Sequence, residues 1–178
     1  MYKIAIAGAG PAGIMAAIKA SEMGQDVTLI EKNPILGKKL LLSGKGRCNL
    51  TNTSDLNSFL KRFSGNAEFL RDAFKKFFNQ DLINFFEKRG LGLKVERQLR
   101  VFPKTDSSVS ILDVLKKELS AKKVKILYKS KVRDIILRDN KVKGLLLESG
   151  NVIPAERIIL ATGGVSYAFT GSSGEGLE

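Results

Sequence analysis

The glycines closest to the N-terminus have the types and spacing of a dinucleotide-binding turn. The segment reads Gly8, Ala9, Gly10, Pro11, Ala12, Gly13, which is a GxGxxG pattern. In such a turn the first glycine permits a tight reversal, the second lets the backbone approach a pyrophosphate, and the third lets a helix pack closely on a strand. The helix N-terminus adds free backbone N–H groups and the positive end of its dipole. These residues therefore predict a site for the pyrophosphate of a dinucleotide.

The elements expected on either side of the pattern support this interpretation. The apolar run from Tyr2 to Ala7 predicts a buried strand, and Pro11 to Met23 predicts a helix that Gly24 stops. A second strand is expected from Asp26 to Glu31, parallel to the first because a crossover helix joins them. Glu31 follows the last glycine of the pattern by 18 positions. An acid at that place accepts hydrogen bonds from an adenosine ribose and would repel a 2′-phosphate.

A second candidate site is the stretch LLSGKGRCNLTN, which we place in a loop from Lys38 to Asn52 because of its glycines and polar residues. It is not a P-loop for a nucleoside triphosphate, since Lys39 stands where such a loop needs a glycine. It is not the active site of a disulfide-reducing flavoenzyme either, because Cys48 is the only cysteine in the chain. For Cys48 we favour a small buried packing residue over a reactive thiol, since free cysteines are usually buried and inert.

Length and composition limit the classes of protein that the chain can belong to. Its 178 residues suit one domain or a piece of a larger one, and 43% hydrophobic with 27% charged residues is ordinary globular usage. The absence of histidine excludes an imidazole acid or base and the histidine-containing zinc sites, and we expect no metal site. A single cysteine is consistent with a cytoplasmic protein. We expect no membrane span, because the glycines near the start interrupt its apolar run.

The middle of the chain reads as a helical and hairpin excursion at about residues 55–103. Helical spacing predicts two helices between Asn66 and Arg89, whose phenylalanines we assign to the core. Alternation from Leu93 to Pro103 predicts a pair of short strands. A helix from Ser107 to Ala121 should follow, capped by Asp106 or by Ser107.

The remaining segments complete an α/β fold of three layers, a Rossmann-like domain. We expect a parallel sheet with helices on one face and an antiparallel β-meander, from about Val132 to Pro154, on the other. Turn signals at Asp139-Asn140 and Ser149-Gly150 divide the meander into strands. The expected parallel strands are Tyr2–Ala7, Asp26–Glu31, Val124–Tyr128 and Arg157–Ala161.

Three blocks of sequence closely resemble the BaiN/RdsA-like family of NAD(P)/FAD-dependent oxidoreductases, flavoproteins of the glutathione-reductase-like superfamily. The blocks are GKKLLLSGKGRCNLTN (residues 37–52), ERQLRVFPKTDSS (residues 96–108) and ILATGGVSYAFTGSSGEG (residues 159–176). The resemblance covers essentially the whole chain, and three blocks in this order are far more specific than GxGxxG alone. It implies FAD as the cofactor and NAD(P)H as the electron donor.

The resemblance also implies which residues bind the cofactor. Glu31 and Lys32 would lie at the adenosine end, and Val132 would meet the adenine through its backbone. The residues expected along the flavin side of the cofactor are Ser43, Gly44, Gly46, Arg47, Cys48 and Asn49. The segment beside the FAD would comprise Ala161, Thr162, Gly163 and Gly164, and Lys39 is a further expected cofactor-binding residue. Arg47 would be either a fixed cation that stabilises the anion formed on flavin reduction or a phosphate or surface contact.

The chain departs from the family mainly in length. Ala168 stands where the family usually has proline, and Ser173 and Glu175 replace residues of similar kind. Family members continue with an inserted middle domain and a return to the flavin, so we expect this chain to be the N-terminal portion of a larger flavoprotein, either an expressed piece or the product of a truncated gene. In both cases much of the substrate site would be missing, which bears on catalysis more than on cofactor binding. The complete enzyme would pass hydride from NAD(P)H through FAD to an unsaturated or carbonyl substrate, with a proton donor other than histidine.

Two other interpretations stay open. The net charge of +12 and several lysine pairs would suit a nucleic-acid-binding module, although no RNP1, zinc-finger or helix-turn-helix pattern supports one. Flavin chemistry and RNA binding could also coincide, because proteins of the RdsA type are linked to uridine reduction in ribosomal RNA. An NAD-only Rossmann domain is the weaker alternative, since the meander and the Ala-Thr-Gly strand would have no role in it.

Overall fold

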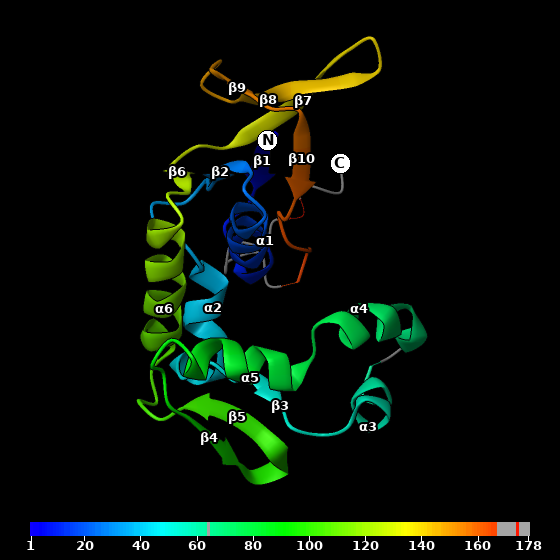
Figure 1. Cartoon of the computed structure of the whole chain (residues 1–178), viewed down its shortest axis with the longest axis vertical. Helices are drawn as coiled ribbons and strands as arrows, with labels where there is room; N and C mark the ends of the chain where they lie inside the picture. The colour runs from blue at the N-terminus through cyan, green and yellow to red at the C-terminus, as the bar shows by residue number, and fades with distance from the viewer. Residues whose placement is uncertain (64, 167–173, 175–178) are drawn as a thin grey trace. The chain divides into compact units, whose positions relative to one another are not determined.

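The computed structural model describes residues 1–63, 65–166 and 174 and divides the chain into two compact units (Figure 1). Unit 1 comprises Met1–Leu40 and Leu115–Glu178, and unit 2 comprises Leu41–Val114. The excursion expected at about residues 55–103 falls inside unit 2. Each unit has its own sheets, so each is described by itself.

Unit 1 is built on a four-stranded parallel sheet in the order β10-β1-β2-β6. The sheet pairs Ala7 of β1 with Ile30 of β2 on one side and with Leu160 of β10 on the other. The strands are β1 (Lys3–Ala7), β2 (Asp26–Ile30), β6 (Lys125–Leu127) and β10 (Arg157–Leu160). All four expected parallel strands are confirmed, with ends that differ by at most one residue.

One face of this sheet is covered by helix α1 (Pro11–Glu22), which contacts β1, β2 and β10. Its buried residues Ile14, Ala17 and Ile18 recur at helical spacing and form its inner face. Ile6 is fully buried and points to the face opposite that of Ala5 and Ala7, because side chains alternate along a strand. The helix α6 (Ser108–Ala121) begins in unit 2 and continues into unit 1, where Leu119 is fully buried.

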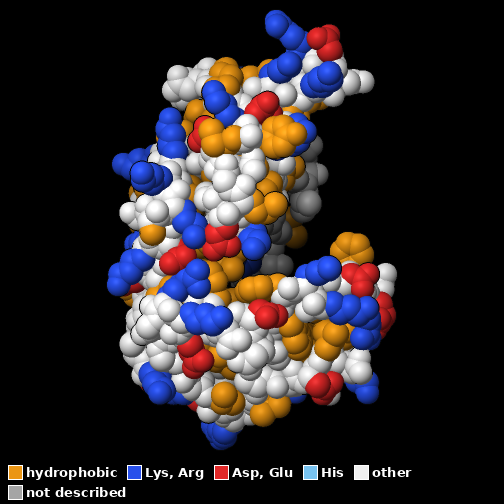
Figure 2. All heavy atoms as spheres, viewed as in Figure 1, with side chains coloured by type: hydrophobic (Ala, Val, Ile, Leu, Met, Phe, Trp, Pro, Cys, Tyr) orange, Lys and Arg blue, Asp and Glu red, His pale blue; other side chains and the backbone are white. Residues whose placement is uncertain are grey.

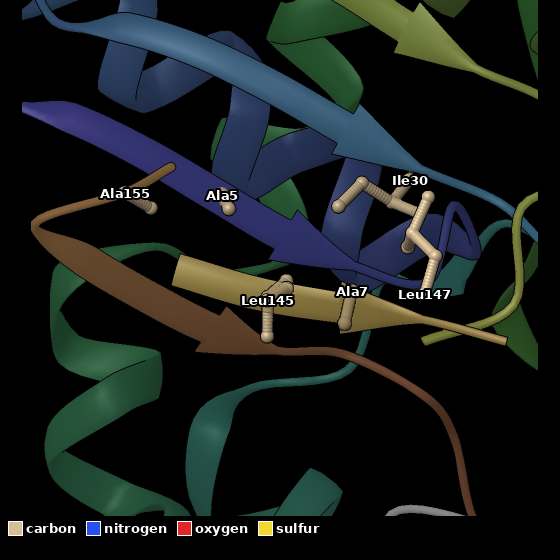
Figure 3. Close-up of a cluster of buried hydrophobic side chains, with 6 residues drawn as sticks. All are labelled: Ala5, Ala7, Ile30, Leu145, Leu147 and Ala155. Carbon is tan, nitrogen blue, oxygen red and sulfur yellow. The ribbon is translucent and has the colours of Figure 1, made fainter. Parts of the chain in front are cut away.

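The other face carries the antiparallel meander β7-β8-β9. Its strands are β7 (Val132–Arg138), β8 (Lys141–Leu147) and β9 (Val152–Pro154). Figure 3 shows Leu145 of β8 in one cluster with Ala5 and Ala7 of β1, and Leu147 of β8 next to Ile30. Ile30 and Ala155 complete this buried cluster. The expected three layers of helix, parallel sheet and meander are therefore confirmed.

Unit 2 contains a small antiparallel sheet in the order β3-β5-β4 and several short helices. The strands are β3 (Thr51–Asn52), β4 (Leu93–Glu96) and β5 (Arg100–Pro103), so the expected strand pair is confirmed. The α-helices are the end of α2 (Lys38–Leu42), α3 (Leu56–Leu60), α4 (Arg71–Lys76), α5 (Asn79–Glu87) and the start of α6. The 3₁₀ turns are η1 (Ser43–Gly46), η2 (Ala67–Leu70) and η3 (Arg97–Leu99).

Two expectations for this region need correction. Lys38–Leu42 is a short helix and not part of a loop, because its lysines and leucines are good helix formers. The phenylalanines are not all core residues: Phe86 is buried, but Phe77 is 42% exposed. The rings of Phe74 and Phe78 instead pack on Phe59, with centroids 5.4 and 5.2 Å away. Helix α4 has only six residues, so it offers too little surface to bury every ring.

Candidate functional site: a dinucleotide cleft in unit 1

A cleft of about 690 Å³ lies in unit 1 at the carboxyl ends of β1, β2 and β10. Open α/β sheets bind their ligands at this place, outside the carboxyl ends of the strands. The start of β7 forms a further wall. The sequence-predicted residues that line the cleft are Gly8, Gly10, Pro11, Ala12, Glu31, Lys32, Lys39, Val132, Ala161, Thr162 and Gly163.

The three glycines of the turn have different surroundings. Gly8 has φ +99°, and a Cβ there would overlap the carbonyl oxygen of Ala161. A Cβ on Gly13 would overlap the carbonyl oxygen of Gly8, so this glycine is where helix and strand pack most closely. Gly10 is the opposite case, because a Cβ there would meet nothing within 4 Å. The space above Gly10 is open to a ligand, as the dinucleotide pattern requires.

The start of α1 is suited to an anion. Gly10 is the N-cap residue, no side chain caps the helix, and Pro11 occupies the first turn. The backbone N–H groups of the first turn of a helix lack intrahelical partners, and the dipole favours negative charge there. Gly10, Pro11 and Ala12 all line the cleft. An uncapped helix end beside an open glycine therefore fits a diphosphate.

Glu31 lies directly after the end of β2, and three hydrogen bonds hold its side chain in place. Its Oε2 accepts from the Ala9 N–H at 2.9 Å, and its Oε1 accepts from the N–H and side-chain amide of Asn33 at 2.8 and 2.6 Å. Glu31 is 7% exposed. A carboxylate has about four acceptor positions, which leaves capacity for one further donor such as a ribose hydroxyl. Asn33 was not predicted from the sequence, since it belongs to no motif.

Basic side chains surround the same cleft. Lys32 and Lys39 were predicted, whereas Lys38, Lys131 and Arg133 were not. Lys39 Nζ donates to the Ser166 carbonyl oxygen at 3.0 Å. Lys131 Nζ lies 2.6 Å from Glu148 Oε1. Lys131 and Arg133 flank Val132 in the sequence, so its predicted place was the one signal that could have indicated them, and Lys38 directly precedes the predicted Lys39.

The Ala-Thr-Gly segment follows β10 directly. The Ala161 N–H donates to the Ala7 carbonyl oxygen at 2.8 Å, which ties the segment to the end of β1. Gly163 has φ +83°, a conformation that favours glycine. Gly164 is exposed and does not line the cleft. Ala168, Ser173 and Glu175, in the rest of the third block, lie outside the described residues.

The other predicted flavin-side residues, Ser43 to Asn49, belong to unit 2. Their loop contains four residues with positive φ, Gly44, Lys45, Gly46 and Cys48. The Cys48 N–H donates to the Ser43 carbonyl oxygen at 3.0 Å. Cys48 is 5% exposed, and this burial raises the pKa of its thiol despite a hydrogen bond with Ser43 that lowers it. The favoured interpretation of Cys48 as a packing residue agrees with these observations.

Arg47 lies in an ion-pair network that the sequence did not reveal. Its Nη1 lies 2.9 Å from Glu96 Oε1 and 3.1 Å from Asp106 Oδ1. Lys94 Nζ reaches the same two acids, at 3.3 and 2.7 Å. The hydrogen bond from Arg47 lowers the pKa of Glu96, and those from Lys94 and then Arg47 lower the pKa of Asp106. These contacts also raise the pKa of Arg47 above its ordinary value.

Fold and cleft together define a class of protein. A parallel sheet with a glycine turn, an acid after β2 and a meander on one face defines a dinucleotide-binding Rossmann domain. The chain belongs to the family of the HI0933-like protein Rossmann domain, whose model matches residues 2–178. The family and fold predicted from the three sequence blocks are therefore confirmed.

Comparison with known proteins identifies relatives of two kinds. The chain is 37% identical to the 3-dehydro-bile acid delta(4,6)-reductase of Clostridium scindens, over 99% of this chain and 42% of that protein. It is 30% identical to the ribosomal RNA dihydrouridine synthase of Haemophilus influenzae, over 97% of this chain and 43% of that protein. The chain therefore spans less than half the length of these relatives.

A solved structure supports the fold independently. The 3-ketosteroid-delta4-(5alpha)-dehydrogenase of Rhodococcus jostii RHA1 matches this chain with a TM-score of 0.71 and 19% identity. The match covers 93% of this chain and 47% of the dehydrogenase chain.

Helices long and apolar enough to cross a membrane do not occur in the described part of the chain.

Proposed function

We propose that this chain is the FAD-binding portion of a flavin-dependent oxidoreductase. The observation that carries the proposal is the cleft of unit 1, where the open glycine Gly10, the uncapped start of α1 and the held carboxylate of Glu31 meet. These three features match the pyrophosphate and ribose of a dinucleotide. Membership of the HI0933-like family favours FAD as that dinucleotide.

Each residue of the cleft then has a role in binding. The N–H groups at the start of α1 would bind the pyrophosphate, and Glu31 would accept from the adenosine ribose. Lys32 and the backbone of Val132 would lie along the adenosine. Ala161 to Gly164 would lie beside the cofactor farther along, with Ser43 to Asn49 of unit 2 on the flavin side. FAD itself would supply the hydride-transfer chemistry.

For the whole protein we propose hydride transfer from NAD(P)H through FAD to an unsaturated or carbonyl substrate, in the cytoplasm. The bile-acid reductase in the family supports a small-molecule substrate of this kind. Within this chain, which lacks histidine, only other side chains could donate the substrate proton.

Titration of the purified chain with FAD tests the binding proposal, with the quenching of flavin fluorescence as the measured signal. Saturation at one FAD per chain is expected, and NAD should bind far more weakly. Substitution of Gly10 by a bulky residue such as valine provides the control, because the side chain would occupy the open space above the turn. Equal quenching by the wild type and Gly10→Val would overturn the proposed location.

RNA is a second candidate substrate, favoured by an exposed aromatic and basic segment of unit 2. Phe69 is 82% exposed and Phe63 41% exposed, and Lys61, Arg62 and Lys76 are exposed nearby in the sequence. Rings that stack on bases and cations that contact phosphates are the usual means of binding single-stranded RNA. The relative named ribosomal RNA dihydrouridine synthase also supports RNA as a candidate substrate.

Fluorescence anisotropy with a labelled single-stranded RNA separates the two substrate classes. RNA binding should weaken steeply with salt and fall with Phe69→Ala. The control is Val152→Ala, an exposed apolar residue of the meander. No binding at low salt would remove the RNA candidate and leave the small-molecule one.

A further inference from the structure

The loop that carries Ser43 to Asn49 has a conformation that its own residues do not favour. Besides two glycines, Lys45 has φ 56° and Cys48 has φ 60°, in the left-handed region where side chains are strained. Such residues persist only where their surroundings fix them. Something outside the loop must therefore hold it.

The backbone of the loop rests against β5. Directly after the loop, the Leu50 N–H donates to the Val101 carbonyl oxygen of β5 at 2.8 Å, and within the loop the Arg47 N–H donates to the Gly44 carbonyl oxygen at 3.2 Å. A Cβ on Gly44 would lie 2.6 Å from the Asn49 nitrogen and 3.3 Å from the ring of Phe102. The loop thus packs closely on the strand, with Gly44 at the closest approach.

The side chain of Arg47 extends this attachment to the β4–β5 hairpin and the turn after it. Its guanidinium carbon lies 4.1 Å from the centre of the Phe102 ring. Its ion pairs reach Glu96 on β4 and Asp106 beyond β5, residues 49 and 59 positions away in the sequence. One side chain of the first sequence block therefore contacts three residues of the second block.

The network is balanced in charge. Two cations, Arg47 and Lys94, share two carboxylates, Glu96 and Asp106. Both acids are ionised at neutral pH, and the hydrogen bonds from Arg47 and Lys94 lower their pKa values further. A cation compensated in this way exerts little net field on a distant group, because opposite charges beside it cancel most of its potential. Its geometric effect on the loop is unaffected by that cancellation.

We propose that Arg47 is a positioning residue: with Lys94, Glu96, Asp106 and Phe102 it forms a clamp that holds the Ser43–Asn49 loop in its left-handed conformation. The ERQLRVFPKTDSS block thereby has a role, which is to hold the GKGRCN loop. That this loop conformation serves flavin binding rests on the proposed function. The positioning role differs from the role predicted from the sequence, in which the charge of Arg47 stabilises the anion of the reduced flavin.

Hydrogen exchange of the loop amides in the chain without FAD tests the clamp by itself. Arg47→Gln and Glu96→Gln should each speed exchange in residues 43–50, on the order of tenfold for the loss of one charged hydrogen bond. Arg97→Gln is the matched control, since it removes an exposed arginine from the same hairpin. If exchange in both clamp variants equals that of the wild type, the clamp is wrong.

The midpoint potential of bound FAD separates positioning from direct charge. A clamp predicts that Arg47→Gln and Glu96→Gln both weaken FAD binding while leaving the potential unchanged. A direct cation predicts shifts of opposite sign, because one variant removes a positive charge and the other a negative one. Opposite shifts would therefore overturn the proposal. Failure of the wild type to bind FAD would refute the proposed function, and the exchange result would still decide whether the clamp exists.

Arg47→Lys provides a second variant if Arg47→Gln does not fold. It keeps the charge but loses the planar group that stacks on Phe102 and reaches both acids. Faster loop exchange in Arg47→Lys supports the clamp, and exchange equal to that of the wild type contradicts it.

Discussion

Single residues of the glycine turn carry distinct roles that mutation can separate. Gly13 is required for packing, because a Cβ there would overlap the Gly8 carbonyl oxygen. Gly10 is required for ligand binding, because a Cβ there would meet no protein atom within 4 Å and would instead occupy space left for the ligand. The same amino acid thus serves stability at one position and binding at the other, three residues apart.

Gly13→Ala should lower the free energy of unfolding by about 1–3 kcal/mol, the usual cost of forcing an extra methyl group into a packed site. Gly10→Ala should change it by less than about 0.5 kcal/mol, as for other substitutions into open space, but should weaken FAD binding. Urea unfolding of both variants, paired with flavin titration, measures the two effects. Equal unfolding free energies for the two variants would refute this division of roles.

Glu31 combines both roles, because it organises the turn and faces the cleft. Glu31→Gln should destabilise the chain by about 1–3 kcal/mol. Both carboxylate oxygens of Glu31 accept hydrogen bonds from N–H groups, and the NH₂ group of a glutamine side chain would have to face one of these donors. It should also weaken FAD binding. Glu148→Gln, at an exposed ion pair, is the control and should have little effect. Thermal unfolding and FAD titration that match the wild type would exclude a role for Glu31 in either.

The elements of unit 1 were largely predictable because their signals are local. The glycine turn, the apolar runs and the turn residues of the meander each lie within a few positions of the structure that they specify. Asn33 was missed because it belongs to no motif, and Lys131 and Arg133 had no signal beyond the predicted place of their neighbour Val132. The Arg47 network was missed because its acids lie 49 and 59 positions away in the sequence, beyond the reach of any local pattern. Helix α2 was missed because five residues give too short a periodic signal.

The contact between meander and sheet should contribute strongly to the stability of unit 1. Leu145 of β8 is fully buried between the layers. Leu145→Ala should lower the free energy of unfolding by about 2–5 kcal/mol through lost burial and the cavity left behind. Val152→Ala on exposed β9 is the control. A loss below about 1 kcal/mol for Leu145→Ala would mean that the layers are not packed as described.

The network around Arg47 should make unit 2 sensitive to acid. The pKa values of Glu96 and Asp106 are lowered in the folded chain, mainly by hydrogen bonds from Arg47 and Lys94 respectively. Their contribution is therefore fully present above the ordinary carboxyl pKa values of about 4, and it is lost as pH falls through the lowered values. Asp106→Asn should speed exchange of the loop amides at pH 7, and this difference from the wild type should disappear in acid. A difference independent of pH would contradict the assignment.

At the scale of the whole molecule, the strong positive charge of the sequence is spread out. Figure 2 shows Lys and Arg side chains over both units on one face, with acidic side chains among them. The net charge of +12 favours phosphate-bearing ligands in general. The specific claim for FAD rests instead on the cleft of unit 1 and on family membership.

The most direct test of the central claim is the visible absorption spectrum of the purified chain after saturation with FAD and removal of the excess. The account predicts a flavin spectrum at about one FAD per chain, with intact FAD released on denaturation. A colourless protein that retains no FAD, or one that retains NAD in its place, would contradict it.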